Sequence, residues 1–510
     1  TTMAEGFEGK RKADEISSSV SVPEGLAASL AEFGQSHLLE FVEKGLVPAE
    51  DGAALLDKLA TLDLKRIRDA FQSTTGAGES EEATKEEGDG VQPPDSYASV
   101  NGLGDEEKAA CFARGMAEIV AGRAAVLVLG GGQGTRLGFD GPKGMFDIGL
   151  PSKATLFQLY AQRVRRLEMM ADEAAGRFQL GGMRAPPTQI PFVVMTSPLN
   201  HSTTTSYFAE NGYFGLKEEQ VRFFPQGTLP ALTPEGKIIM TNGSTLSEAP
   251  DGNGGIYDAL RASGTLDALE AQGIRSLHVF SVDNAICKVC DPLFIGYCLG
   301  QGAAVGNKVV WKAHAGEKVG VVAKRNGRPA IIEYSELGEE MAAKADAEGK
   351  LLFGAGNICN HYFTVAFLRQ VATAYQESPK VLPYHIAKKK VPYAGEDGAT
   401  VTPDTPNAVK LEAFIFDSFP LAATSAILEV NREEEFSPVK NAPGSAADSP
   451  DTARAMITSL HASWIAKAGG NVEGGGVVEI SPLVSFGGEG LKGRTGAALV
   501  STSENPLLVE

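Results

Sequence analysis

Short apolar runs that end in glycine or a polar residue occur at intervals in the middle of the chain. Residues 126–129 run into Gly130, and residues 191–195 and 277–282 have the same character. Such runs are typical of strands that are buried on both faces of a parallel sheet. Stretches with helical spacing lie between them, at residues 156–170, 202–210 and 255–272. Strands that alternate with helices predict an α/β fold with a doubly wound, mixed sheet.

The two ends of the chain follow other patterns. Large apolar residues recur at helical spacing over residues 24–72, which predicts helices, and residues 73–95 form an acidic, glycine-rich linker or surface loop. We expect a hairpin about Asn326-Gly327, between strands at 319–322 and 330–334. After a second low-complexity stretch at 441–451, strands are expected at 477–480 and 482–486. The predicted domains are an N-terminal helical region (1–98), a central α/β domain (99–440) and a small β-containing C-terminal domain (441–510).

Composition and charge narrow the class of protein. The chain has 510 residues, 43% of them hydrophobic, and a formal net charge of −18. This charge argues against a nucleic-acid or membrane-surface binder, because polyanions would be repelled. Because no apolar run is long enough to cross a bilayer and no signal peptide is recognisable, we expect a cytoplasmic protein.

The five cysteines are too few for a disulfide scaffold of this size. Cys287 and Cys290 form a C-x-x-C pair, which has two interpretations: a zinc or redox site, or buried structural thiols. A structural zinc site usually needs a second such pair, and the sequence has none, so buried thiols are favoured.

A glycine-rich segment follows the first predicted strand, with the sequence Leu-Gly-Gly-Gly-Gln-Gly-Thr-Arg-Leu-Gly over residues 129–138. Glycines let the backbone approach a ligand closely and turn N–H groups toward an anion. The segment fits neither the P-loop pattern nor the Rossmann dinucleotide pattern, and a flexible turn with a solvated arginine is the alternative. Arg136 and Lys143 favour a phosphate site, because nucleotidyl transfer builds negative charge that fixed cations oppose.

Residues 130–138, followed by Pro-Lys-Gly-Met at 142–145 and Gly-Leu-Pro-Ser at 149–152, resemble the signature of eukaryotic UDP-N-acetylglucosamine (UDP-N-acetylhexosamine) pyrophosphorylases. Further blocks occur in the family's order at 224–227, 249–255, 282–284, 333–336, 355–358, 414–417 and 436–440. The resemblance implies a Rossmann-like nucleotidyltransferase domain. It also implies that UTP and N-acetylglucosamine 1-phosphate are converted to UDP-N-acetylglucosamine and pyrophosphate, with Mg²⁺ as cofactor. Gly130 and Ala408 depart from the family's usual Ala and Gly, but both changes exchange small residues, so binding is expected to survive.

Uracil carries two carbonyl acceptors and one N–H donor, which an amide side chain or a turn of backbone can match. The resemblance assigns Gln226 and Gly252 to the uridine, and Asn253 to the sugar or ribose side. A plain Asp-Gly or Asn-Gly turn is the alternative for residues 249–255. Asp283 ends a predicted strand, where open α/β sheets bind ligands. A carboxylate there can hold Mg²⁺ or cap a helix; the resemblance favours the metal, with Asp417 as a second candidate.

Carboxylate and amide groups pair well with sugar hydroxyls, so Glu333 and Asn357 are expected at the sugar, where Gly320 would let the backbone come near. Phe414 and Phe416 alternate on an expected strand and would either form a wall near the N-acetyl group or pack in the core. The predicted catalytic residues are Arg136, Lys143 and Lys440; the predicted substrate-binding residues are Gly130, Gly131, Gly132, Gln226, Gly252, Asn253, Gly320, Glu333, Asn357, Lys410, Phe414 and Phe416; and the predicted metal ligand is Asp283.

The expected reaction is a direct attack of the sugar phosphate on the α-phosphorus of UTP, so no nucleophile–base pair is needed. Three rival functions stay open on the sequence alone. A pyrophosphorylase for UDP-glucose or for UDP-sugars in general differs only in the sugar pocket. A dinucleotide-dependent oxidoreductase lacks its glycine pattern here, and a non-catalytic UDP-sugar sensor would not need the cations.

Overall fold

The computed structural model describes residues 20–75, 90–176, 178–179, 182–183, 186–378, 381–470, 472, 477–492 and 507–509. Its internal contacts divide the chain into two compact units. Unit 1 comprises Thr1–Ser80, Thr228–Ala249 and Pro383–Glu412, and unit 2 comprises Glu81–Gly227, Pro250–Leu382 and Ala413–Glu510. The domain boundaries expected near residues 98 and 440 stay a prediction. Among the described helices, none has the length and apolar character that crossing a membrane requires.

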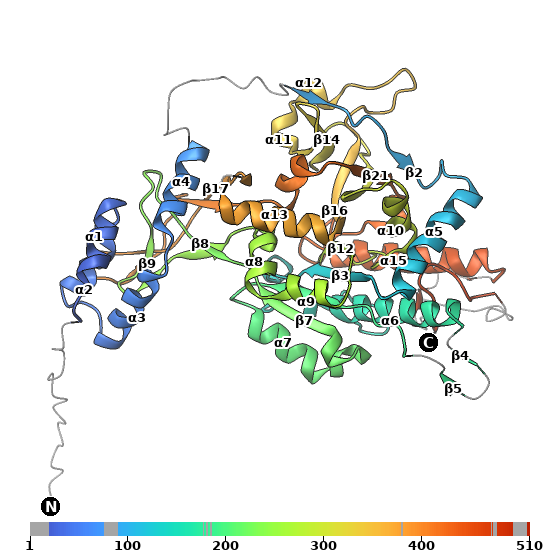
Figure 1. Cartoon of the computed structure of the whole chain (residues 1–510), viewed down its shortest axis with the longest axis horizontal. Coiled ribbons are helices and arrows are strands. Elements are labelled where there is room, and N and C mark those ends of the chain that lie inside the picture. The colour runs from blue at the N-terminus through green and yellow to red at the C-terminus, as the bar shows by residue number, and fades with distance from the viewer. Residues whose placement is uncertain are drawn as a thin grey trace, which may run out of the picture. The chain divides into compact units, whose positions relative to one another are not determined.

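Unit 1 joins a helical N-terminal segment to small sheets (Figure 1). Its helices are α1 (Glu24–Glu32), η1 (Ser36–Leu39), α2 (Glu40–Glu43), α3 (Ala49–Ala60) and α4 (Leu64–Thr75). They confirm the helices predicted over residues 24–72. Its strands are β8 (Thr228–Pro230), β9 (Met240–Asn242), β10 (Thr245–Leu246), β17 (His385–Lys389), β18 (Tyr393–Ala394), β19 (Thr400–Val401) and β20 (Ala408–Glu412), and β8 pairs with β11 (Glu248–Pro250). Leu30, Leu38 and Leu59, each at most 1% exposed, are the best-buried apolar side chains of the helical segment.

Unit 2 is built on an 11-stranded mixed sheet, which confirms the predicted α/β architecture. Along its main path the strands are β2 (Ala98–Ser99), β21 (Ser425–Glu429), β13 (Val305–Trp311), β16 (Ala355–Thr364), β12 (Ser276–Ser281), β3 (Ala124–Leu129), β6 (Phe192–Thr196) and β7 (Val221–Pro225). The run β12-β3-β6-β7 is parallel, and β16 is antiparallel to both β12 and β13. The strands β14 (Val321–Arg325) and β15 (Arg328–Ile332) form the predicted hairpin, and β1 (Val91–Gln92) pairs with β14.

Helices cover both faces of this sheet (Figure 1). The longer ones are α5 (Asp105–Val120), α6 (Leu156–Ala174), α7 (His201–Glu210), α8 (Ile256–Ala262), α9 (Thr265–Ala271), α10 (Pro292–Gly300), α13 (Val365–Glu377) and α15 (Pro450–Lys467); the shortest are α11 (Tyr334–Leu337), α12 (Glu339–Ala342) and α14 (Arg432–Glu435). Val126 and Val128 of β3 belong to a core with α5, α6 and α10, whereas Ala125 and Leu127 belong to a second core with α8, α9 and α13. Because both faces of β3 are buried, its sequence is a continuous apolar run.

The structure corrects the sequence analysis in two places outside the site. Residues 255–272 form two helices, α8 and α9, because Gly264 turns the chain with φ +69°. The prediction of a strand at 482–486 is wrong. Val484 donates instead to the carbonyl of Ser481, and the Glu489 carboxylate accepts from the backbone N–H of Phe486 at 2.8 Å.

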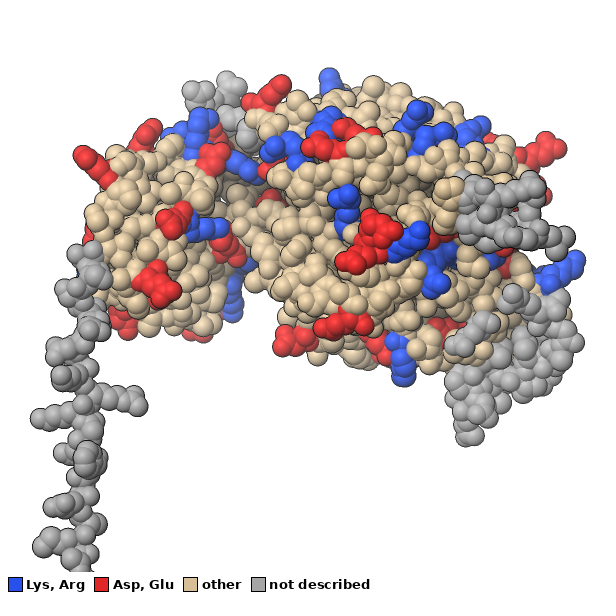
Figure 2. Space-filling view, turned by 60° about the horizontal axis from the view of Figure 1, so that its bottom comes forward, with Lys and Arg blue, Asp and Glu red and all other residues tan. Residues whose placement is uncertain are grey.

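Four further predictions concern the strand near residue 478, the hairpin turn, the acidic stretch and the surface charge. The expected strand near residue 478 is present as β22 (Val478–Ile480), and its partner is β23 (Leu507–Val509). In the predicted hairpin, Asn326 and Gly327 both have positive φ (52° and 75°), as a tight two-residue turn requires. The acidic stretch at 79–89 lies outside the described residues. On the face seen in Figure 2, described acidic and basic side chains are interspersed rather than gathered into one basic patch.

Candidate active site

The order of strands in unit 2 reverses next to β3. After β3 the chain builds β6 and β7 on one side, then returns to place β12 on the other side. Leu129 of β3 pairs with Ser281 of β12, so the segments that follow these two strands leave the sheet at one edge. Because β16 is antiparallel to β12, with Asn360 opposite Phe280, residues just before Asn360 also reach this edge. Such a switch point is the usual ligand site of an open α/β sheet.

The glycine-rich segment is folded back on itself at this edge. Gly130 N–H donates to the Met195 carbonyl (2.8 Å), and the Asn200 side-chain amide donates to the Gly130 carbonyl (3.1 Å). Farther along, Lys143 N–H donates to the Gly132 carbonyl (3.1 Å). These bonds hold Gly130 and the carbonyl of Gly132, while a Cβ on Gly132 would meet nothing within 4 Å. Space beside Gly132 is therefore open, and a ligand can approach the backbone there.

Gly131 lies against the amide that was predicted to read uracil. A Cβ on Gly131 would lie 2.8 Å from Gln226 Oε1, so glycine is what permits this approach. Gln226 is only 8% exposed, and its backbone N–H donates to the Thr196 carbonyl (2.8 Å) at the end of β6. At Gly130, a Cβ would lie 3.2 Å from the Met195 carbonyl oxygen, so the family's usual alanine would need a shift of a few tenths of an ångström. The glycine here removes that crowding.

Three cations and one carboxylate interact at the same edge. Burial lowers the pKa of Lys143, the Asp283 carboxylate opposes this change, and Lys440 and Arg136 add to it. Lys143 and Asp283 are half-buried, and Arg136 and Lys440 are exposed. The structure thus brings together all three predicted catalytic residues and the predicted metal ligand. Lys410 lies in unit 1, on β20 opposite Ala387, and its role in substrate binding stays a prediction.

Asp283 follows β12, and its position is held through its backbone. Its carbonyl accepts a hydrogen bond from Val439 N–H (2.9 Å). Burial raises the pKa of the neighbouring Cys359 thiol to about 12, with the Asp283 charge acting in the same direction and Lys440 against it. Within the described part of the chain, no group of three or more His, Cys, Asp or Glu side chains could hold a metal by itself. A single carboxylate beside a phosphate site is nevertheless how Mg²⁺ is often held, with phosphate oxygens and water as its other ligands.

The turn at residues 251–254 is interlocked with residues 413–415. Gly252 has φ +90°, and a Cβ there would lie 2.3 Å from the Ala413 carbonyl oxygen. Gly254 N–H donates to that carbonyl (2.9 Å), and Ala413 N–H donates to the Asp251 carbonyl (2.8 Å). The Asn253 side-chain oxygen accepts from Ile415 N–H (2.9 Å), and the predicted contact of Asn253 with the sugar or ribose stays a prediction. This turn is therefore more than a plain surface turn.

The strand expected around Phe414 and Phe416 is wrong. Ile415–Leu421 is a 3₁₀ helix, η8, because the Asp417 carboxylate accepts from Phe414 N–H (2.7 Å) and caps its start. Asp417 therefore acts as a cap here, where it had been a second candidate for the metal. The two phenylalanine rings still lie together, with centroids 5.0 Å apart. Phe416 is 8% exposed and packs in the core, whereas Phe414 is half-buried.

The three residues predicted at the sugar also come together. Asn357 N–H donates to the Gly320 carbonyl (2.8 Å), and a Cβ on Gly320 would lie 2.8 Å from Glu333 Oε1. The Asn357 side-chain oxygen accepts from Cys359 N–H (3.0 Å), which fixes the amide at the start of β16. Glu333 and Asn357 thus both lie next to Gly320, and a carboxylate and an amide are suitable partners for hydroxyl groups.

Sequence reasoning missed several residues that shape the site. Asn200 holds the Gly130 carbonyl, and Gly144 is required because a Cβ there would lie 2.2 Å from the Phe157 ring. Asn284, which follows Asp283 directly, is 2% exposed and bonded through its side chain to residues more than 150 positions away. Gly144 and Asn284 carried a signal, since they lie beside Lys143 and Asp283 in the blocks 142–145 and 282–284, whereas Asn200 carried none.

The C-x-x-C pair lies behind the site, in the core. Cys287 and Cys290 are both fully buried, as structural thiols are. Burial raises the pKa of Cys287 to about 12, so its thiol is kept protonated. The Asn360 amide donates to Cys287 Sγ (3.4 Å), and the backbone N–H of Cys290 donates to His278 Nδ1 (2.9 Å).

Comparisons with known proteins agree with this arrangement. Residues 77–473 match the model of the family described as UTP–glucose-1-phosphate uridylyltransferase. A UDP-N-acetylhexosamine pyrophosphorylase-like protein from Xenopus tropicalis is 41% identical over 482 residues, covering 90% of this chain and 92% of that protein. The UDP-N-acetylglucosamine pyrophosphorylase of Saccharomyces cerevisiae is 39% identical over 470 residues, covering 90% and 94%.

Among solved structures, the uridine diphosphate N-acetylglucosamine pyrophosphorylase of Trypanosoma brucei superimposes with a TM-score of 0.79 at 30% sequence identity. The match covers 97% of this chain and 99% of that one. Relatives of this similarity span almost the full length of both chains, glycine-rich segment and switch point included. The chain therefore belongs to the UTP–glucose-1-phosphate uridylyltransferase family and, within it, to the UDP-N-acetylglucosamine pyrophosphorylases.

Proposed function

We propose that this chain transfers the uridylyl group of UTP to N-acetylglucosamine 1-phosphate, which yields UDP-N-acetylglucosamine and pyrophosphate. The observation that carries the proposal is the set of Arg136, Lys143, Lys440 and Asp283 around the open glycine-rich segment at the switch point. The relatives from Saccharomyces cerevisiae and Trypanosoma brucei are pyrophosphorylases of this same sugar nucleotide, which supports the proposal.

The residues of the site fit each part of the reaction. Gln226, which lies against Gly131, and the turn at Gly252 are suited to the uracil, and the open backbone at Gly132 is suited to the phosphates. An oxygen of the sugar phosphate attacks the α-phosphorus of UTP, and the bond from that phosphorus to the bridging oxygen of pyrophosphate breaks. Both reactants are anions before they meet, so the protein's task is to position them and to oppose charge, with no proton to remove.

The three cations serve this task in different ways. Half-buried Lys143 offers a charge that is little screened by water, and burial in turn makes its proton easier to lose. Exposed Arg136 and Lys440 flank it and can meet the charge that appears on departing pyrophosphate. Because these three cations offset negative charge in one place, a strongly acidic chain can bind two polyanions there.

A divalent metal is consistent with the family, and we propose Mg²⁺, held by Asp283. When bound, such an ion would supply positive charge that offsets the charge of the phosphates. The half-buried carboxylate at the carboxyl end of β12 is chemically suited to such an ion. The same proposal includes a cytoplasmic location, supported by five cysteines that all remain free thiols.

The test is a substrate panel with purified protein, UTP and Mg²⁺, in which release of pyrophosphate is measured. N-acetylglucosamine 1-phosphate should be the best of three acceptors, with N-acetylgalactosamine 1-phosphate weaker and glucose 1-phosphate weakest. Equal or faster reaction with glucose 1-phosphate would contradict the sugar assignment and favour a UDP-glucose or broad UDP-sugar enzyme. No pyrophosphate release with any acceptor would overturn the proposed reaction itself.

A further inference from the structure

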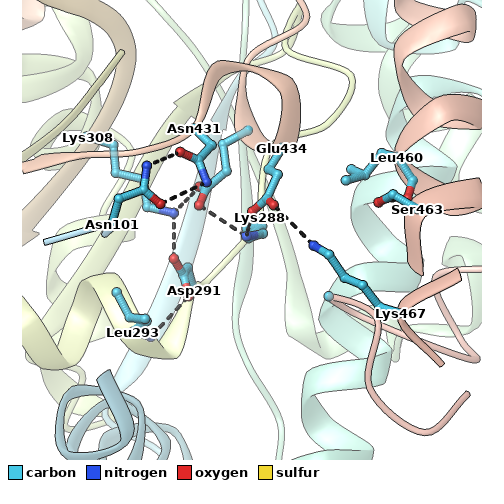
Figure 3. Close-up of polar contacts among 12 residues, drawn as sticks. Asn101, Lys288, Asp291, Leu293, Lys308, Asn431, Glu434, Leu460, Ser463 and Lys467 are labelled. Atoms are coloured by element: carbon cyan, nitrogen blue, oxygen red, sulfur yellow. Dashed lines mark hydrogen bonds and ion pairs between the residues drawn. The ribbon is translucent and has the colours of Figure 1, made fainter. Parts of the chain in front are cut away.

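A buried cluster of charged side chains lies in unit 2, on strand β13, helix α14 and the loop before α10 (Figure 3). Lys308 on β13 is 0% exposed, and its ammonium group donates to Asp291 Oδ2 (2.5 Å) and to the Glu435 carboxylate. The other oxygen of Asp291 caps helix α10 by accepting from Leu293 N–H (3.0 Å). Lys288 lies 3.2 Å from Glu435 Oε1. Glu435 is thus held by two buried or half-buried lysines.

This cluster keeps its charges despite burial. Burial by itself lowers the pKa of Lys308, but the carboxylates of Asp291 and Glu435 raise it above its ordinary value overall. Two carboxylates around one ammonium, with Lys288 beside them, give a balanced set of charges. A buried pair of this kind seldom adds much stability compared with apolar packing, so its use is sought in what it positions.

The Glu435 end of the cluster begins the segment that carries Lys440. Asn284, 2% exposed, donates from its amide nitrogen to the Glu435 carbonyl (2.7 Å), and its side-chain oxygen accepts from Ser437 N–H (2.9 Å). Backbone bonds extend the contact on both sides: Ala285 N–H donates to the Ser437 carbonyl (3.1 Å) and Val439 N–H to the Asp283 carbonyl (2.9 Å). Residues 283–285 and 435–439 are therefore joined at four points.

Lys440 follows this junction directly. Its side chain is exposed, and its ammonium nitrogen lies 6.0 Å from the centroid of the Phe436 ring. Its backbone N–H donates to the Asp448 carbonyl (2.7 Å). The place of its ammonium group relative to Lys143 and Asp283 therefore depends on backbone anchors rather than on a tight side-chain contact. Asn284 supplies two of those anchors from the residue next to Asp283.

We infer that Asn284 is a positioning residue, which sets Lys440 against Asp283 and Lys143 with the support of the buried Lys308–Glu435 pair. The inference rests on the proposed function, in which Lys440 opposes phosphate charge. An amide suits this place, because the position needs one donor for the Glu435 carbonyl and one acceptor for Ser437 N–H, and the asparagine side chain supplies both. A carboxylate lacks the donor, and an apolar side chain lacks both.

The experiment is a double-mutant cycle of Asn284→Ala and Lys440→Ala, with kcat and KM measured for UTP and the sugar phosphate. Each single change should lower kcat about tenfold to a hundredfold, because small displacements of a catalytic group are costly. KM for the sugar phosphate should change less than about threefold. In the double variant the losses should not multiply: once Lys440 is gone, removing Asn284 should cost little more.

Two further measurements separate positioning from a loss of structure. The affinity for inorganic pyrophosphate, followed by calorimetry, should fall by the same factor in Asn284→Ala and Lys440→Ala and no further in the double variant. Glu435→Gln, which leaves Lys308 paired with Asp291, replaces Asn284→Ala if that protein does not fold, and should show the same non-additivity. Asn101→Ala is the matched control: it removes an exposed bond to Asn431 at the start of α14 (Figure 3), and kcat should not change.

The outcomes are distinct. Multiplicative losses for Asn284→Ala and Lys440→Ala would overturn the inference and leave Asn284 a structural residue. Full activity of Lys440→Ala would remove the premise that Lys440 acts in the reaction, and the inference with it, while the proposed function would stand. A wild-type protein that releases no pyrophosphate would instead mark the failure of the proposed function.

Discussion

The half-buried ammonium of Lys143 is expected to be the most important single charge of the site. Arg136 and Lys440 flank it, and Asp283 attracts it. Removing one fixed group that opposes developing charge costs about 3–4 kcal/mol, or 10²–10³ in kcat. Two neighbouring cations survive in Lys143→Met, so we expect a loss near 10²; exposed Arg136, replaced by alanine, should cost less than Lys143 because water screens it more.

The lowered pKa of Lys143 adds a pH test. Burial disfavours the charged form, so the charge is lost as pH rises through a value below the ordinary lysine pKa of about 10.4. We therefore expect kcat/KM of the wild type to fall on the alkaline side, since kcat/KM reports groups of the free enzyme. Lys143→Arg, which stays charged, should move that fall to higher pH.

The assay is pyrophosphate release at several pH values, with Lys153→Met as the control because Lys153 is an exposed lysine ten positions further on. Thermal unfolding should show that each variant is folded. A folded Lys143→Met with kcat/KM within threefold of the wild type would refute the assignment. An alkaline fall that is unchanged in Lys143→Arg would show that another group causes it.

Three further predictions concern metal, sugar and backbone. Chelation should abolish activity, and Asp283→Asn should raise the Mg²⁺ concentration needed for half-maximal rate; full activity in excess chelator would contradict the metal site. Asn357→Ala should lower kcat/KM most for N-acetylated sugar phosphates if its amide reads the acetamido side, whereas an equal loss with glucose 1-phosphate would show that it reads a shared hydroxyl. Gly252→Ala should lower the unfolding temperature and raise KM for UTP more than Gly264→Ala does. Gly264 has a left-handed helical backbone, where a Cβ costs about 1–2 kcal/mol, whereas Gly252 (φ +90°, ψ 172°) lies in a region that only glycine adopts readily, and its Cβ would also lie 2.3 Å from a carbonyl oxygen; equal effects would contradict this reasoning.

The strands and helices of the main sheet could be predicted well because their signals are local. Residues 126–129 are apolar on both faces, and the helical spacing of 156–170 is regular, so β3 and α6 were predicted within a few residues. The expected strands that failed depend on single polar side chains. Asp417 caps a 3₁₀ helix at Phe414, and Glu489 collects the backbone N–H groups near Phe486. The spacing of apolar residues along the chain does not reveal these carboxylate–backbone hydrogen bonds.

The candidate site was predicted where it rests on recognised blocks and missed where it rests on pairing across the fold. Gly131, Gln226 and Lys143 belong to such blocks, and the structure brings the last of them together with Arg136, Lys440 and Asp283. Asn284 follows Asp283 in the block 282–284 but had no predicted role, because its partners, Glu435 and Ser437, lie at the end of α14 and just after it. Such a contact leaves no trace in the spacing of residues along the chain.

The pairing of β2 with β21 has a consequence for biosynthesis. Ala98 lies opposite Leu428, so a strand made early in translation waits for one made late. Until the ribosome has delivered β21, one edge of β13 has no neighbour, and exposed strand edges invite contact with other chains. The segment that brings Lys440 to Lys143 is made later still, so a nascent chain should bury most of its sheet before it can hold a nucleotide. Nascent chains stalled before β21 should therefore be the ones that most need a chaperone.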